Sequence, residues 1–434
     1  MAYEQKIFSG DRLYDKCTYS TADPLFALPG SNISTGEGEI IPISEKLLSS
    51  HILLLGGIGS GKTNVFNLLL RNILTSMTQD DVVIIFDSKG DFYRNFYKKG
   101  DIVISNDENA TNGQTADYWN IFREISVDDR LEENVLEISK TLFHEKINSS
   151  SQPFFPNAAR DIFSAMLLEL IRNPNSVQMR NNASLRKLFN GFSVDAMKAL
   201  LARHPDLKAM ESYIQDPNSG QTMGVVSELQ QLVREIFVGN FAKNGSLSIR
   251  EIVKNKGKKV VFVECDLSIG SMLTPIYRLI IDLAIKQALC RKQSEGNVYF
   301  IMDEFRLLPE LNHMDNGVNF GRSLGAKFIV GVQNVDQVIA AYGRETASSL
   351  MSGFATNISF RVNDKNSREY IRGLYGNNIK LFTFMSAVQS RGVNEQLRDA
   401  FVVEDSDITS LSPGQAIVGI LNSPPFRFQF REYK

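Results

Sequence analysis

The sequence has few cysteines and almost no net charge. Three cysteines (Cys17, Cys265 and Cys290) occur in 434 residues, an odd number without metal-ligand spacing. Such sparse use of cysteine indicates a reducing compartment. The 47 basic and 49 acidic side chains leave a formal net charge of −2. This excludes a protein that holds nucleic acid through its overall charge, so any such contact must come from local loops.

The sequence also lacks a segment typical of membrane insertion or export. A bilayer-spanning helix needs about 20 mainly apolar residues. The best candidate, residues 273–289, is interrupted by Arg278, Asp282 and Lys286, which favours an amphipathic helix. The first 30 residues lack the apolar core of a signal peptide. We therefore expect a cytoplasmic protein with no membrane segment in this chain.

One glycine-rich stretch carries the strongest signal. It matches the pattern G-x-x-x-x-G-K-[ST] at every fixed position, and its candidate ligand-binding residues are Gly56, Gly57, Gly59, Ser60, Gly61, Lys62 and Thr63. The preceding residues 51–55 are typical of a short buried strand, and residues 64–74 have apolar side chains at helical spacing. The glycines therefore lie between a strand and a helix, as this loop requires.

The residue types of this stretch predict a nucleoside triphosphate site. Glycines allow the backbone N–H groups to point at phosphate oxygens beside the positive end of a helix. We expect Lys62 to reach the β- and γ-phosphates and the Thr63 hydroxyl to bind magnesium. The cofactors predicted are ATP and Mg²⁺. A turn that binds nothing is the alternative, and the full match argues against it.

Strand patterns alternate with helical ones along the rest of the chain, which predicts an α/β fold with a mostly parallel sheet flanked by helices. Further strands are expected at residues 82–86, 259–264, 298–302, 327–332, 356–361 and 415–420. Between the second strand and Asp303 the patterns are mainly helical. We expect an inserted all-helical domain at 156–250, with the nucleotide-binding domain formed by 1–155 and 251–434.

Polar residues follow several of these strands, at the edge of a parallel sheet where ligands bind. Asp87, Asp303, Glu304 and Gln333 occupy such positions and are expected to converge with the glycine loop. Asp303 can hold the metal and Glu304 can activate water. Gln333 can contact the γ-phosphate or the water as a sensor. A solvated turn and a satisfied amide are the structural alternatives.

Two arginines are candidates for a residue that stabilises charge on a transferring phosphoryl group. Arg322 is the first choice and Arg361 the reserve, because a guanidinium is a planar, multiply donating cation. An ordinary surface arginine is the alternative for either. A single chain does not show whether Arg322 reaches a neighbouring subunit.

Together these residues resemble the conjugative coupling ATPases of type IV secretion, within the FtsK/HerA group of translocases. The motifs that carry the resemblance are the phosphate loop, Asp87-Ser88-Lys89-Gly90-Asp91, Asp303-Glu304-Phe305, Gly321-Arg322 and Gln333, with a similar layout around 401–404 and 411–415. It covers roughly residues 40–430. Members usually begin with a transmembrane anchor, and we expect neither such an anchor nor relaxase-docking extensions in this chain.

The resemblance implies a RecA-like core, an all-helical insertion and a hexameric ring around DNA. It implies that Arg322 acts on the neighbouring subunit and that Gln333 couples hydrolysis to movement. Partners would be DNA, identical subunits and proteins of a secretion, plasmid or defence system. Two alternatives stay open: a motor or recruitment platform that grips polypeptide, and a nucleotide-switched regulator that activates a partner. Lys243-Asn244-Gly245 and Arg391-Gly392 are flexible basic loops that could contact DNA or could simply be solvated.

Overall fold

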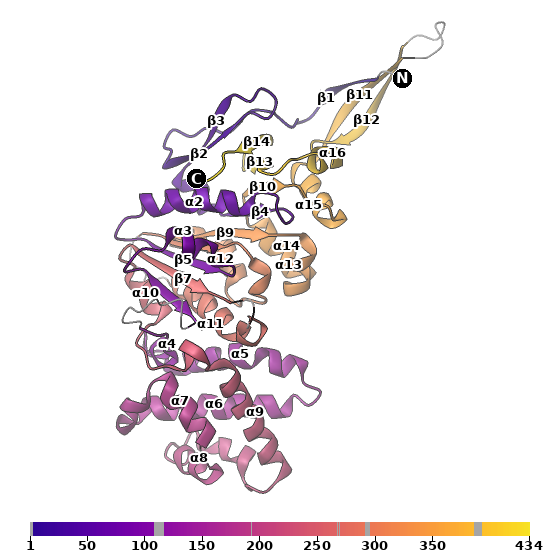
Figure 1. Ribbon diagram of the computed structural model, residues 1–434. Helices are drawn as coiled ribbons and strands as arrows, with labels where there is room; N and C mark the ends of the chain where they lie inside the picture. Colours follow the sequence, from indigo (N-terminus) through magenta and orange to yellow (C-terminus); the bar gives the residue numbers. More distant parts are fainter. Residues whose placement is uncertain are drawn as a thin grey trace. The chain divides into compact units, whose positions relative to one another are not determined.

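The computed structural model describes residues 3–107, 117–191, 193–266, 268, 270–290, 296–385 and 393–434. The chain divides into two compact units. Unit 1 contains Met1–Thr78, Tyr299–Glu310 and Met314–Lys434, and unit 2 contains Gln79–Val298 and Leu311–His313. Figure 1 shows the course of the chain through their elements.

The strands of unit 1 follow the order β3-β2-β14-β13-β10-β4-β9-β8. Their bounds are β2 Phe26–Ser31, β3 Gly38–Ile43, β4 Ile52–Leu55, β8 Val298–Met302, β9 Ala326–Val332, β10 Thr356–Phe360, β13 Gln415–Ile420 and β14 Phe426–Phe430. The central strand β4 is parallel to both β9 and β10. The strands β13, β14, β2 and β3 extend the sheet in antiparallel fashion. The strands predicted in this unit are confirmed, with β13 antiparallel to β10, and β2, β3 and β14 are additions.

Helix α2 (Lys62–Ser76) follows the glycine loop, and its apolar residues recur at helical spacing. Its buried face includes Val65, Phe66, Leu69 and Ile73, each at most 1% exposed. Full burial of such side chains stabilises the fold by roughly 1.5–3 kcal/mol each. The other helical elements of unit 1 are α1 Glu45–Ser49, η5 Phe305–Leu307, α12 Met314–Phe320, η6 Gly321–Leu324, α13 Val335–Tyr342, α14 Arg344–Ser352, α15 Lys365–Tyr375 and α16 Asp405–Thr409.

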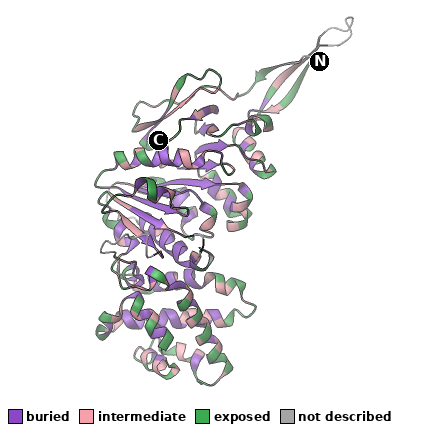
Figure 2. Cartoon of the chain, in the orientation of Figure 1, coloured by how far each residue is buried: buried purple, intermediate pink, exposed green. Residues whose placement is uncertain are grey.

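A separate small sheet also belongs to unit 1. It joins β1 (Tyr3–Ser9), β11 (Asn377–Met385) and β12 (Val393–Phe401) in antiparallel order β1-β11-β12. Most of its described side chains are exposed or half-buried (Figure 2). Arg391-Gly392, one of the loops considered above, lies outside the described residues.

Unit 2 contains β5 (Val82–Asp87), β7 (Lys259–Glu264) and β6 (Ile102–Ser105), in the order β5-β7-β6 and all parallel. Between β6 and β7 the described residues form helices α4 Ile121–Ile125, α5 Leu131–Ser149, α6 Phe154–Arg172, α7 Asn182–Gly191, α8 Val194–Leu201, α9 Gly220–Ile236 and α10 Ile249–Asn255. Helix α3 (Asp91–Phe96) follows β5 and α11 (Gly270–Ala288) follows β7. Helix α5 packs against α6 and α11, and α6 packs against α9.

Candidate nucleotide-binding site

The glycine loop lies at the carboxyl end of β4, directly before α2. Gly59 and Gly61 have φ angles of 71° and 110°, in the region that side chains rarely adopt. A Cβ atom at Gly61 would also lie 2.8 Å from the backbone nitrogen of Gly414. Glycine is therefore required there both by backbone conformation and by space, and the predicted strand–loop–helix context is confirmed.

Neighbouring segments hold the loop in place through the backbone. The N–H of Gly57 donates to the carbonyl of Arg361 at 2.9 Å, and the N–H of Gly414 donates to the carbonyl of Ser60 at 2.9 Å. The residues after β10 and before β13 thereby brace the loop from outside. A loop fixed in this way loses little conformational entropy when it binds a ligand.

The Lys62 side chain packs against the glycine loop, and only 8% of its surface is exposed. Its ammonium group donates to the carbonyl oxygens of Gly56 and Gly57. These contacts keep the positive charge beside the first turn of α2, and the N-terminus of a helix favours an anion. A buried cation beside a glycine loop at a helix N-terminus suits the phosphates of a nucleotide.

Thr63 and Asp303 meet across the site. The hydroxyl of Thr63 donates to Oδ2 of Asp303 at 3.1 Å, although 240 positions separate them in the chain. Asp303 directly follows β8 and is 9% exposed. A hydroxyl and a carboxylate are hard oxygen ligands of the kind that Mg²⁺ prefers. The residues present thus fit Mg²⁺ bound with a nucleoside triphosphate.

Glu304 contacts the residue predicted as the sensor. Its Oε2 accepts a hydrogen bond from Nε2 of Gln333 at 2.8 Å, and its Oε1 is paired with Nε of Arg306 at 3.0 Å. Glu304 is 5% exposed. The candidate general base and the candidate sensor therefore form one hydrogen-bonded group, in which movement of Gln333 changes the surroundings of the Glu304 carboxylate. Arg306 was not predicted, although a basic residue two positions after Glu304 was a visible signal.

A close approach of two strands makes this contact possible. A Cβ atom at Gly331 would lie 2.2 Å from the carbonyl oxygen of Asp303. Only glycine allows β9 to pass so near the end of β8. Gly331 stands two positions before Gln333, and its lack of a side chain brings Gln333 within reach of Glu304.

Asp87 has a different setting, in unit 2. Its two carboxylate oxygens accept backbone N–H groups of the residues that follow β5, at 2.8–3.1 Å: Lys89, Gly90, Phe92 and Tyr93. Asp87 also faces Glu264 at the end of β7. Burial, reinforced by the Asp87 charge and a hydrogen bond between the two side chains, raises the pKa of Glu264 to about 9. The predicted contact of Asp87 with nucleotide stays a prediction.

Arg322 lies at the opposite end of β9 from Gln333. It belongs to η6, which precedes β9, and its side chain is exposed. The seven residues of β9 span roughly 23 Å, so Arg322 is far from the phosphate loop of its own chain. It lines a hollow of about 800 Å³ together with Ser44, Lys46 and Leu421. That hollow contains no residue of the phosphate loop.

Arg361, the reserve candidate, lies at the carboxyl end of the parallel strands, on the same side of the sheet as the phosphate loop. It follows β10 and is exposed, and its carbonyl oxygen accepts the N–H of Gly57. The two candidate arginines are therefore distinguished by position: Arg361 is beside its own phosphate loop, and Arg322 faces away from it. Sequence spacing alone did not separate them.

The confirmed loop geometry, the Thr63–Asp303 pair and the acidic end of a parallel strand define a class. A phosphate loop of this form, opposed by a strand-end aspartate and glutamate, is the site of P-loop ATPases that activate water. The protein is a P-loop ATPase.

The family follows from comparison with known proteins. A family model described as the type IV secretion-system coupling protein DNA-binding domain matches residues 37–427. The chain therefore belongs to the family of type IV secretion-system coupling proteins. The resemblance drawn from the sequence motifs is confirmed.

Solved structures agree on the fold. The chain is similar to the bacterial conjugative coupling protein TrwBdeltaN70, with a TM-score of 0.72 and 17% identity over 91% of this chain and 87% of that one. It is similar to TrwB bound to the ATP analogue ADPNP, with a TM-score of 0.73 and 16% identity, covering 100% and 96%. VirB4 of Thermoanaerobacter pseudethanolicus gives 0.57 and 12%, covering 96% and 98%. The RecA-like fold is thereby confirmed.

TrwB has also been solved with ADP and Mg²⁺, at a TM-score of 0.64 and 17% identity. The curated proteins contain no significant match to this chain. Among the residues that the structure describes, no helix is both long enough and apolar enough to cross a membrane.

Proposed function

We propose that this protein hydrolyses Mg²⁺-bound ATP to move DNA, and that it does so as a hexameric ring of identical subunits. The contact between Glu304 and Gln333 is the observation that carries the proposal, because it joins a general base to a sensor of the nucleotide state. Membership of a family named for its DNA-binding domain supports DNA as the substrate.

Each residue of the site has a role that follows from its chemistry. Lys62 and the N–H groups of the loop neutralise phosphate charge. Thr63 and Asp303 would hold Mg²⁺, which would supply further positive charge to the phosphates. Glu304 orients the attacking water and takes its proton. To do so, its carboxylate must present an oxygen to water, which requires rearrangement of its bonds with Gln333 or Arg306.

Arg322 would complete the site of a neighbouring subunit. The phosphate loop follows the carboxyl end of β4, and Arg322 precedes the amino end of the parallel strand β9. The nucleotide of one copy could therefore lie beside the guanidinium of the next copy. Such a head-to-tail contact uses two different surfaces and closes into a ring when the rotation between copies permits. Arg322 is exposed in this hollow, so its guanidinium can be reached by a neighbouring copy.

Mixing two inactive variants tests this arrangement. Arg322→Ala subunits keep Glu304, and Glu304→Gln subunits keep Arg322, so a mixed ring regains sites wherever an Arg322→Ala subunit receives the arginine of a Glu304→Gln neighbour. With random 1:1 mixing about a quarter of interfaces become active. The matched control is Arg361→Ala mixed with Glu304→Gln, which restores nothing if Arg361 acts within its own chain. Absence of complementation by Arg322→Ala would remove the claim.

DNA contacts must come from local basic groups, since the net charge is −2. In the loop Lys243-Asn244-Gly245, the Lys243 ammonium lies 5.0 Å from the centre of the Tyr118 ring. The carbonyl of Gly245 accepts a hydrogen bond from Asn120 at 2.8 Å. This loop is therefore anchored, so it offers DNA a cation held at a defined place.

A nucleotide-switched regulator is the second candidate. Both oxygens of Glu304 are engaged by side chains of the same chain, as expected of a site that rests until a partner acts on it. Such a protein would hydrolyse ATP slowly and would respond to a protein partner rather than to DNA. A polypeptide-gripping motor would likewise respond to protein.

ATP hydrolysis measured with double-stranded DNA, single-stranded DNA and candidate partner proteins separates these functions. The proposal predicts stimulation by DNA that falls as salt is raised, because counterions compete with basic groups for phosphates. The Glu304→Gln variant measures contaminating activity. Stimulation by protein alone would establish one of the alternatives and overturn the DNA motor.

We further propose a cytoplasmic site of action with partner proteins of a secretion, plasmid or defence system. The three widely spaced cysteines support a reducing compartment. Localisation of a tagged full-length chain in its native host tests this placement, and a periplasmic or surface location would contradict it.

A further inference from the structure

The segment that follows Glu304 is anchored at both ends. Residues Phe305–Glu310 belong to unit 1 and Leu311–His313 to unit 2, so the chain passes from one unit to the other here. On the unit 1 side, the Phe305 ring stacks on Tyr342 with centroids 5.2 Å apart. The Tyr342 hydroxyl donates to the carbonyl of Leu308 at 2.7 Å.

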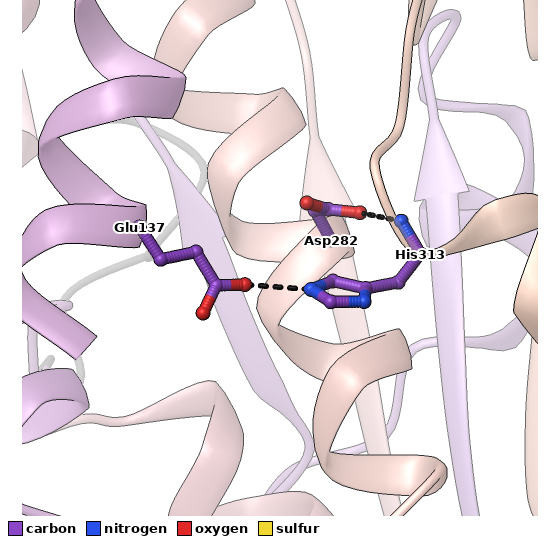
Figure 3. Close-up of side chains that lie close together, drawn as sticks. All are labelled: Glu137, Asp282 and His313. Carbon is purple, nitrogen blue, oxygen red and sulfur yellow. Dashed lines mark hydrogen bonds and ion pairs between the residues drawn. The ribbon is translucent and has the colours of Figure 1, made fainter. Parts of the chain in front are cut away.

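The unit 2 end is held by a cluster of charged side chains (Figure 3). Nε2 of His313 lies 2.6 Å from Oε1 of Glu137 on α5, and the backbone N–H of His313 donates to Oδ1 of Asp282 on α11 at 2.8 Å. Asn312 donates to Oδ2 of Asp282 at 2.9 Å. Lys286, one turn after Asp282, pairs with Oε2 of Glu137.

Glu137, Asp282 and His313 also have the composition and proximity of a metal site. Here each of the four carboxylate oxygens already accepts a hydrogen bond from the chain. Lys286 supplies a positive charge, and a protonated His313 supplies a second, so the two carboxylates are balanced without an ion. A metal would have to displace these donors. The arrangement is that of a closed hydrogen-bonded latch.

The charges reinforce the closed form. Burial disfavours the charged form of His313, but the hydrogen bond to Glu137 and the nearby Asp282 and Glu137 carboxylates outweigh it and raise the pKa of His313, with Lys286 opposing them. Burial likewise opposes the charge of Glu137, and its bonds to His313 and Lys286 outweigh that effect and lower its pKa.

We propose that His313 is a positioning residue for ATP hydrolysis: with Glu137, Asp282 and Lys286 it latches the segment after Glu304 to helices α5 and α11. Glu304 is nine positions before His313 in a segment tied down at Leu308 and again at Asn312 and His313. Release of one tie gives this segment freedom, and a misplacement of the general base by about 1 Å can cost on the order of 100-fold in rate.

The latch also gives the helices of unit 2 a route to the catalytic residue. Helix α5, which carries Glu137, packs against α6, and α6 packs against α9. A ligand that displaces these helices would pull on Glu137 and therefore on His313. This inference rests on the proposed function, since it would connect a DNA contact in unit 2 with hydrolysis at Glu304.

A second histidine–glutamate pair in unit 2 supplies a matched control. Nε2 of His204 lies 2.5 Å from Oε2 of Glu169 on α6, and Arg203 binds the other oxygen of that carboxylate. Glu169 is fully buried. The pair has the same chemistry as His313 and Glu137 but stands far along the chain from Glu304. His204→Leu therefore removes an equivalent contact outside the segment.

The test compares His313→Leu with His204→Leu in the full-length chain, using kcat, MgATP affinity, thermal unfolding and DNA stimulation. The proposal predicts that His313→Leu lowers kcat about ten-fold or more with MgATP affinity changed less than two-fold. It predicts that kcat of the parent falls as pH rises through the raised pKa of His313, where this residue loses its proton, and that His313→Leu lacks this limb. His204→Leu should keep both the rate and the pH profile.

Milder variants keep the test decisive if His313→Leu does not fold. His313→Gln retains a donor toward Glu137 and should recover most of the rate, and Glu137→Gln should reproduce the loss. Equal losses in the His313 and His204 variants, or an unchanged pH profile, would overturn the latch. Loss of activity with a zinc-selective chelator in excess Mg²⁺, restored by added zinc, would overturn the latch and establish the metal site instead. A parent enzyme without DNA stimulation would contradict the proposed function alone, because basal kcat still tests the latch.

Discussion

Strands β5 and β8 each lead into an aspartate, and the two ends are built differently. At the end of β8, Asp303 meets the hydroxyl of Thr63, and Glu304 meets the side chains of Gln333 and Arg306. At the end of β5, Asp87 accepts four backbone N–H groups, two from the turn that follows the strand and two from the first turn of α3. Both strands are fully buried and apolar, so the sequence signal was the same.

The two strand ends differ in whether the hydrogen-bond partners of their carboxylates can be replaced by a ligand. Side-chain partners can rotate away and yield to a nucleotide, a metal ion or water. Backbone N–H groups cannot leave without unfolding the turn, and an unpaired buried N–H costs roughly 1–3 kcal/mol. The β8 end is therefore suited to chemistry, and the β5 end to holding the chain in shape.

The largest predicted effect concerns Glu304, at the end of β8. Glu304→Gln keeps the shape and the contact with Gln333 but removes the base, so kcat should fall on the order of 10²–10⁴-fold while ATP remains bound. Single-turnover hydrolysis and a fluorescent nucleotide titration measure the two properties separately.

Lys62→Ala is the partner variant, because it should weaken nucleotide binding itself by removing the buried cation. Together the two variants separate binding from cleavage. Normal turnover by Glu304→Gln would show that another group activates water and that the β8 end is structural after all.

The next prediction sets the two aspartates directly against each other. Asp87→Asn replaces one accepting oxygen by a donor and should lower the free energy of unfolding by about 2–3 kcal/mol. Asp303→Asn should change stability by less than about 1 kcal/mol but lower kcat about a hundred-fold. Urea denaturation and ATP hydrolysis are measured on both.

The opposite result would give Asp87 the role in nucleotide binding and Asp303 the structural role. If Asp87→Asn kept its stability and lost nucleotide binding, the interpretation of Asp87 as a nucleotide ligand made from sequence would be supported.

The sequence predicted the elements of the site well because their signals are local. The glycine loop and the strand before Asp303 are each recognised within a short stretch of sequence, and parallel strands bring their carboxyl ends to one side of the sheet. Gln333 was placed correctly beside Glu304 for the same reason. Confirmation came from contacts across 240 positions, as between Thr63 and Asp303.

The sequence could not predict which residues from distant segments of the chain contact the site. The bracing glycine Gly414 carries no pattern of its own, since its role depends on the phosphate loop that folds against it. The sheet of β1, β11 and β12 was missed because its strands mix polar and apolar residues without a buried face. To predict at which end of the parallel strands Arg322 and Arg361 lie, the directions of β9 and β10 had to be known.

The smallest predicted effect concerns the pair that Asp87 forms with Glu264. The folded chain holds a proton on Glu264 up to about pH 9, whereas an ordinary glutamate releases it near 4.5. The folded state therefore binds the proton more tightly than the unfolded state does. This stabilisation is complete below pH 4.5 and is lost progressively as pH rises toward 9.

Glu264→Gln should remove this loss, because a glutamine cannot ionise but can still donate a hydrogen bond to Asp87. At pH 8 we expect the variant to be more stable than the parent by about 1–2 kcal/mol, with little difference near pH 5, after allowing for the partial exposure of Glu264. Glu133→Gln, at an exposed position on α5, controls for the change in net charge. Unfolding in urea across pH 5–9 gives the comparison. A variant less stable than the parent at pH 8 would mean that Glu264 is ionised in the folded protein and that the β5 end, like the β8 end, carries a charge available to a ligand.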